Sequence, residues 1–233
     1  MAVETLSYAL SLGAKAVGSQ VIKTTVTPRV TTLECRALFQ GALGAHSIDQ
    51  SSQLLTGSGE SLRFSETAET KGEKHTFEVA FDARSGLVKA TRQVGAQIER
   101  AETPYLRPYR DPLGLLHTLR GLAHGAALTE RVPLLGKDVV IESLGEWVLE
   151  TTNGECPTFG YVLRPGPSYV YLDARPPHAV IRLIQPTQYG QVEASLIRAV
   201  QEDGTLSAPK ESKDRSGKRR RRGGRRRRRV ESN

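Results

Sequence analysis

The sequence contains only two cysteines, Cys35 and Cys156, among 233 residues. Two cysteines cannot build a disulfide framework, and they are too few for a zinc site made from pairs of cysteines. We interpret both as small buried side chains in a reducing compartment, in preference to a bridge between them. We therefore expect neither a metal nor a cofactor.

Long apolar runs are also missing. No segment approaches the roughly 18 apolar residues of a transmembrane helix. Near the N-terminus the first basic residue is Lys15, and residues 3–12 alternate in polarity where a signal peptide would have an apolar run. These features predict a soluble, cytoplasmic protein.

Sequence motifs for nucleophilic catalysis and nucleotide binding are absent. The chain has no G-x-S-x-G elbow, Walker phosphate loop or dinucleotide G-x-G-x-x-G pattern. His117 and His124 lie seven residues apart in a predicted helix. That separation is about 10.5 Å of rise, too far for a shared metal without other ligands. We interpret them as surface or boundary residues and expect no enzymatic activity.

What the sequence does contain is alternation of apolar and polar residues. Leu6, Tyr8, Leu10 and Leu12 fall on one face of a strand, and similar runs recur along the chain up to Leu196. Turn residues such as Asn153-Gly154 separate the runs. The pattern predicts a mainly β fold: an antiparallel, barrel-like or strongly bent sheet of about a dozen short strands. Trp147, within a long predicted strand, is expected in the core.

One segment, residues 111–124, has helical periodicity. Asp111 suits the N-cap, Pro112 suits the first turn, and Gly125 is placed to end the helix. The apolar stripe comprises Leu115, Leu116, Leu119 and Leu122, with Leu116 and Leu119 expected in the core. A second stripe of small residues, Gly114, Thr118, Gly121 and Gly125, indicates close packing on the sheet.

The region from Leu6 to about Val200 resembles the bacterial domain-of-unknown-function family numbered 3108. The resemblance is carried by Leu6–Leu10 with Gly13 and Val17-Gly18, by the helix from Asp111-Pro112-Leu113 to Leu119-Arg120 with Gly125, and by the run from Gly145 through Gly154 to strands at 159–172 and 179–184. It implies a mainly antiparallel, barrel-like β fold with one helix. It implies no activity, and this chain differs from members that carry an export signal.

The charge is concentrated at the C-terminus. Residues 205–233 hold 13 of the 33 Lys and Arg and 3 of the 25 Asp and Glu, a formal charge of +10. Residues 1–204 hold the remaining 20 basic and 22 acidic residues, a formal charge of −2. We therefore divide the chain into a β domain, residues 1–203, and an Arg-rich tail, residues 204–233, expected to be disordered because it lacks apolar residues.

The tail is the strongest candidate for a binding segment. Arginine predominates over lysine there, and guanidinium groups bind phosphate in a bidentate manner and stack on bases. We predict sequence-independent binding of nucleic acid, RNA in preference to DNA. The alternatives are a solubilising tail and attachment to an anionic membrane surface. The predicted contact residues are Lys218, Arg219, Arg220, Arg221, Arg222, Arg225, Arg226, Arg227, Arg228 and Arg229.

A second, smaller candidate is the segment from Tyr105 to Arg110. Tyr105, Arg107, Tyr109 and Arg110 interleave aromatic and basic side chains, as nucleic-acid sites do. The favoured interpretation is structural: a proline-containing loop whose tyrosines pack on the β domain while its arginines face water.

Two hypotheses follow. In the first, the protein is a non-enzymatic nucleic-acid-binding protein whose tail makes the contacts, and a basic path from the tail onto the β domain would favour it. In the second, the β domain binds a small apolar ligand or a protein partner, and the tail only localises it. A cavity lined by Leu, Phe and Val with a few polar groups would favour the second.

Overall fold

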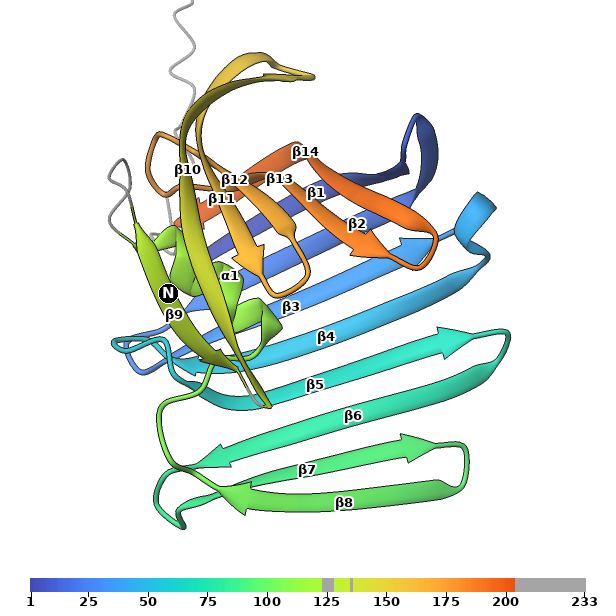
Figure 1. Cartoon of the computed structure of the whole chain (residues 1–233), viewed down its shortest axis with the longest axis vertical. Coiled ribbons are helices and arrows are strands. Elements are labelled where there is room, and N and C mark those ends of the chain that lie inside the picture. The colour runs from blue at the N-terminus through green and yellow to red at the C-terminus, as the bar shows by residue number, and fades with distance from the viewer. Residues whose placement is uncertain (123–127, 135, 204–233) are drawn as a thin grey trace, which may run out of the picture.

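The computed structural model describes residues 1–122, 128–134 and 136–203 (Figure 1). The predicted contact residues of the tail, Lys218 to Arg229, lie outside the described residues, as do His124 and Gly125.

Fourteen strands of the described residues form one continuous antiparallel sheet that does not close into a barrel. The order is β8-β7-β6-β5-β4-β3-β2-β1-β14-β13-β12-β11-β10-β9, so the first and last strands pair in the middle and β8 and β9 are the edges. The strands are β1 (Ala2–Leu12), β2 (Lys15–Val26), β3 (Val30–Phe39), β4 (His46–Leu55), β5 (Ser61–Thr70), β6 (Glu73–Asp82), β7 (Leu87–Val94), β8 (Gln97–Pro104), β9 (Thr129–Leu134), β10 (Lys137–Thr151), β11 (Gly154–Arg164), β12 (Ser168–Asp173), β13 (Val180–Thr187) and β14 (Gly190–Asp203). A short 3₁₀ turn, η1 (Gly41–Leu43), follows β3. The mainly β prediction is confirmed, although many strands are longer than predicted.

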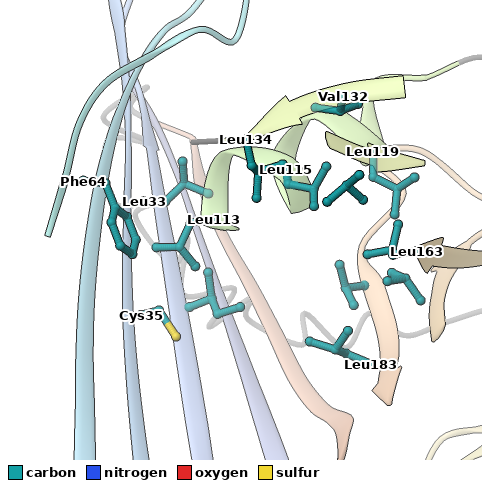
Figure 2. Packing of buried hydrophobic residues seen from close by; sticks show 14 of the residues in the cluster. Leu33, Cys35, Phe64, Leu113, Leu115, Leu119, Val132, Leu134, Leu163 and Leu183 are labelled. Atoms are coloured by element: carbon teal, nitrogen blue, oxygen red, sulfur yellow. The ribbon is translucent and has the colours of Figure 1, made fainter. Parts of the chain in front are cut away.

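The sheet bends around one helix, α1 (Pro112–Arg120), which lies on its concave side (Figure 1). Alternation supplies the apolar concave face: Leu6, Tyr8 and Leu10 of β1 are each at most 3% exposed. These residues share one buried cluster with α1 and with strands from both arms of the sheet. Figure 2 shows Leu113 of α1 directed towards Leu33 and Phe64. The helix thus fills the space between the two arms.

The helix begins as predicted and ends earlier than predicted. Asp111 is the N-cap, and its Oδ1 accepts a hydrogen bond from the Gly114 amide at 2.8 Å. The expected helix over 111–124 is wrong at its C-terminal end, because α1 stops at Arg120. The amide of Gly121 bonds to Thr118 O, and that of Leu122 to Leu119 O. These bonds tighten the chain into a 3₁₀-like turn, and glycine does not favour continuation of the helix.

Burial of the helix is broader than a single stripe. Leu119 is 0% exposed, as predicted, whereas Leu116 is only partly buried and lies at the edge of the core. Leu113, outside the predicted stripe, is 3% exposed because the sheet encloses the helix from two sides. The close approach predicted from small residues is confirmed at Gly114, where a Cβ would lie 3.0 Å from Leu54 Cδ2.

Trp147 is not in the core. Its side chain is 48% exposed and lies over Gly160, edge-on to the ring of Tyr171 at 6.3 Å. The register of β10 against β11 shifts between Ser143 and Gly145, and Gly145 has a φ of 83°. A bulge of this kind breaks the alternation and bends the strand. Beyond the bulge both faces of β10 lie outside the core, since the neighbouring Val148 is 64% exposed.

Candidate functional site

The segment from Tyr105 to Arg110 crosses from one arm of the bent sheet to the other. Tyr109 O accepts a hydrogen bond from the Ser61 amide at the start of β5 at 3.0 Å. The Arg110 amide donates to Pro133 O of β9 at 2.8 Å. Two strands that are distant in the sheet order are thereby joined at the N-terminal end of α1. The backbone of this predicted secondary site therefore has a clear structural role.

The side chains of the segment are mostly engaged with the protein. Tyr109 is 8% exposed and packs edge-on against Tyr105, with ring centroids 5.7 Å apart. Arg110 donates through Nη2 to Ser58 O at 2.7 Å and through Nε to Thr118 Oγ1 at 3.1 Å. Arg107 pairs with Asp138 and keeps 48% of its side chain exposed. Stacking of a base would require the tyrosines to leave these contacts, so the favoured structural interpretation fits for the tyrosines, whereas Arg110 is held by the protein and does not face water as expected.

The carboxylate of Asp111 is buried and accepts more hydrogen bonds than the N-cap alone requires. Asp111 is 3% exposed, and its Oδ2 accepts hydrogen bonds from the hydroxyls of Ser52 and Ser61, both at 2.6 Å. Ser61 Oγ in turn accepts from the Asp111 amide at 2.8 Å. The network ties α1 to β4 and β5. The sequence indicated only the cap, because nothing in it showed that these serines come together.

A cavity of about 120 Å³ lies on the concave face beyond the helix, and no residue of α1 lines it. Its walls come from both arms of the sheet. Apolar side chains dominate, and three glutamines supply the polar groups: the lining is Leu10, Gln20, Cys35, Ala37, Phe39, Ile48, Gln50, Leu183, Gln185, Val192 and Ala194. We name it the Cys35 cavity. It has the lining that the second hypothesis requires.

One polar group of the Cys35 cavity contacts the thiol, and another is held from outside the lining. Gln20 Nε2 lies 3.0 Å from Cys35 Sγ, and Gln50 Nε2 donates to Glu66 Oε2 at 2.7 Å. Burial raises the pKa of the Cys35 thiol above its ordinary value. A thiol with a raised pKa is a poor nucleophile at neutral pH. The cavity is therefore suited to holding a molecule and unsuited to thiolate chemistry.

On the described part of the β domain, nine of the 20 basic residues form ion pairs. Nine basic side chains each lie within 4 Å of a carboxylate: Arg36, Lys89, Arg92, Arg107, Arg120, Arg131, Arg164, Arg175 and Arg182. Pairing of this kind agrees with the formal charge of −2 over residues 1–204. The body consequently has little electrostatic attraction for a polyanion.

The charged residues at the described end of β14 and opposite it on β1 are acidic. Glu202 of β14 pairs with Val3 of β1, and Gln201 pairs with Glu4. The nearest charged positions to the start of the tail are thus acidic. This part of the sheet does not extend a basic surface from the tail.

Two further properties of the described residues bear on function. None of their helices combines the length and the apolar character needed to cross a membrane. Within the same ranges, no three His, Cys, Asp or Glu side chains are grouped closely enough to hold a metal ion.

Comparisons with known proteins support the fold and leave the function open. No family model matches the sequence, and no curated protein matches it. Among solved structures, the chain is similar to a beta-barrel-like protein of domain of unknown function DUF1849 from Brucella abortus. The TM-score is 0.57 at 9% identity, covering 86% of this chain and 98% of the other. At this identity the likeness concerns the fold alone, and membership of the family numbered 3108 stays a prediction.

Proposed function

We propose that the chain is a non-enzymatic binding protein whose Arg-rich tail attaches it to nucleic acid, RNA in preference to DNA, without sequence specificity. The observation that carries the proposal is the segregation of charge, +10 in residues 205–233 against −2 in residues 1–204. Each phosphate neutralised by an arginine releases condensed counter-ions, which favours association. Phosphate contacts position a protein without reading sequence.

The β domain supports this proposal by what its surface offers. Some exposed arginines of the described residues, Arg36, Arg164 and Arg175 among them, already have carboxylate partners that a phosphate would have to displace. The tail has only three acidic residues among its 13 basic ones. Attraction for a polyanion should therefore reside almost wholly in the tail.

The test is fluorescence anisotropy with labelled single-stranded RNA and DNA over a salt series. If about six arginines contact phosphate together, log affinity should fall against log salt with a slope of roughly −4 to −5. A full-length variant with Gln at all nine positions of Arg219–Arg222 and Arg225–Arg229 should lose most of the affinity. The matched variant R107Q/R110Q should lose little. Equal binding by the nine-Gln variant and the wild type would overturn the proposal.

The Cys35 cavity favours a second function, the binding of a small apolar ligand by the β domain. An apolar cavity of roughly 150 Å³ is large enough for benzene, and the Cys35 cavity is of similar size, about 120 Å³. Its three glutamines could orient a polar substituent. Toluene is a suitable probe, and the side-chain amide resonances of Gln20, Gln50 and Gln185 should shift in NMR spectra if it binds there. Unchanged resonances at saturating toluene would exclude this function.

A further inference from the structure

A second cavity, of about 360 Å³, lies where the C-terminal turn of α1 meets β1, β2 and β14. Its lining is separate from that of the Cys35 cavity, with no residue in common. Ala2, Val3, Val26 and Pro177 provide apolar walls. We name it the His117 cavity. Its volume and mixed lining are those of a small-molecule site.

An ion pair forms part of the wall. Arg120 donates to both carboxylate oxygens of Glu4, at 2.6 and 2.9 Å, and each side chain is 13% exposed. Arg120 Nε also donates to His178 O at 3.1 Å, and Nη2 donates to Pro177 O at 3.2 Å. The guanidinium is therefore neutralised and held by the protein itself. An occupant does not need a charge to balance it.

Two polar side chains of the lining have no such engagement. His117 Nδ1 is buried without a hydrogen-bond partner among the described residues. An N–H at that position would be unsatisfied, so the neutral ring carries its proton on Nε2. Burial, and then the nearby Arg120, lower the pKa of His117, which keeps the ring neutral.

Thr24 is the other polar group. The residue is 4% exposed and lines the cavity. Its hydroxyl enters none of the side-chain hydrogen bonds of the described residues. A hydroxyl can donate and accept, whereas the His117 ring offers an N–H. The cavity thus offers apolar walls together with two hydrogen-bonding groups that the protein leaves unused.

We propose that the His117 cavity binds a small, neutral, mostly apolar molecule carrying one hydroxyl or carbonyl group, which hydrogen-bonds to His117 and Thr24. An anion would meet the Glu4 carboxylate and the negative end of the helix dipole. A cation would meet the Arg120 guanidinium. This site is independent of the tail and of the Cys35 cavity.

The probe for the test is 2-naphthol, which is neutral at pH 7.5, with naphthalene as its hydroxyl-free counterpart. We expect backbone amide shifts on titration to centre on Thr24, His117 and Gly121. Val26→Trp should fill the cavity and weaken binding of 2-naphthol more than tenfold. Val21→Trp is the matched control, because Val21 lies on the same strand with its side chain 40% exposed on the other face.

Thr24→Val tests the hydrogen bond without filling the cavity, and it serves if Val26→Trp does not fold. It should weaken 2-naphthol binding about 3- to 10-fold, the effect of one neutral hydrogen bond. Naphthalene binding should be unchanged by the same substitution. Shifts centred on Cys35 and Gln20, equal losses in V26W and V21W, or equal binding by T24V and the wild type would each overturn the proposal. None of these results depends on nucleic-acid binding by the tail.

Discussion

The two ends of the concave face differ in how their space is filled. At one end α1 inserts between the arms of the sheet, and Leu119 and Ile141 are 0% exposed. At the other end α1 does not reach, and the facing strands line the Cys35 cavity. The same sheet, with the same alternation, therefore gives a packed core around Leu119 and leaves unfilled space at the Cys35 end and beside the last turn of α1.

This difference separates stability from binding capacity. A close-packed interior loses free energy when even a methylene group is removed, because the surroundings relax only partly. An interior that already contains a cavity has room for a change in side-chain volume. Substitutions in the packed core around Leu119 should therefore affect the free energy of unfolding, and substitutions that line the Cys35 cavity should mainly affect ligand occupancy.

The largest expected effect is from Leu119→Ala. Leu119 is 0% exposed in α1, so its truncation should lower the free energy of unfolding by about 2–5 kcal/mol. Leu106→Ala is the matched control, because Leu106 is 79% exposed and should change it by less than about 0.5 kcal/mol. Urea denaturation followed by circular dichroism measures both. Equal losses would mean that the helix does not form the core.

A somewhat smaller loss is expected from Asp111→Ala. The substitution removes the N-cap of α1 and leaves the hydroxyls of Ser52 and Ser61 without their acceptor. We expect a loss of about 2–3 kcal/mol, combining the cap with unsatisfied buried donors. Asp49→Ala is the matched control, because it removes only an exposed ion pair with Arg36. It should change the free energy of unfolding by about 0.5 kcal/mol or less in the same denaturation experiment.

Much of the helix end could be predicted from sequence, because local rules determine it. The cap residue Asp111, the proline after it and the burial of Leu119 all follow from patterns within one turn or two. The alternation in β1 and β3 likewise predicted which side chains face inwards. These features depend on residues close together in the chain.

The rest depends on contacts between distant residues. Nothing local shows that Ser52 and Ser61 meet Asp111, that Glu4 meets Arg120, or that Gln20 lies against Cys35. Both cavities are lined by strands from opposite ends of the sequence, so no short pattern could predict them. Trp147 was placed wrongly because β10 beyond its glycine bulge lies outside the core on both faces, which no local pattern reveals. The functional prediction for the tail, in contrast, rests on composition and lies outside the described residues.

The pH dependence of stability distinguishes the helix end further. Burial lowers the pKa of His117 from its ordinary value of 6.5, so the unfolded chain takes up this proton at a higher pH than the folded chain. The neutral His117 therefore contributes fully to the free energy of unfolding above pH 6.5, and this contribution is lost as the pH falls towards the lowered pKa. The loss is at most about 1.4 kcal/mol per pH unit. His117→Gln should flatten this part of the curve when unfolding is measured from pH 8 to pH 5. An unchanged slope would show that His117 is protonated equally readily in both states.

The smallest effect on stability is expected at Ala37, on a strand that contributes both to the core near α1 and to the Cys35 cavity. This residue is 7% exposed, lines the Cys35 cavity and lies on β3, whose Leu33 packs near α1. Ala37→Leu adds three carbon atoms to an unfilled space, so it should avoid most of the 1–3 kcal/mol that overpacking usually costs. We expect a change of less than about 1 kcal/mol in the free energy of unfolding, measured by the same urea titration.

Because the new side chain occupies the cavity, toluene should no longer shift the amide resonances of Gln20, Gln50 and Gln185. A loss as large as that of Leu119→Ala would show that the Cys35 end is packed as tightly as the helix end. The distinction between the stabilising core around Leu119 and the binding space of the Cys35 cavity would then fail.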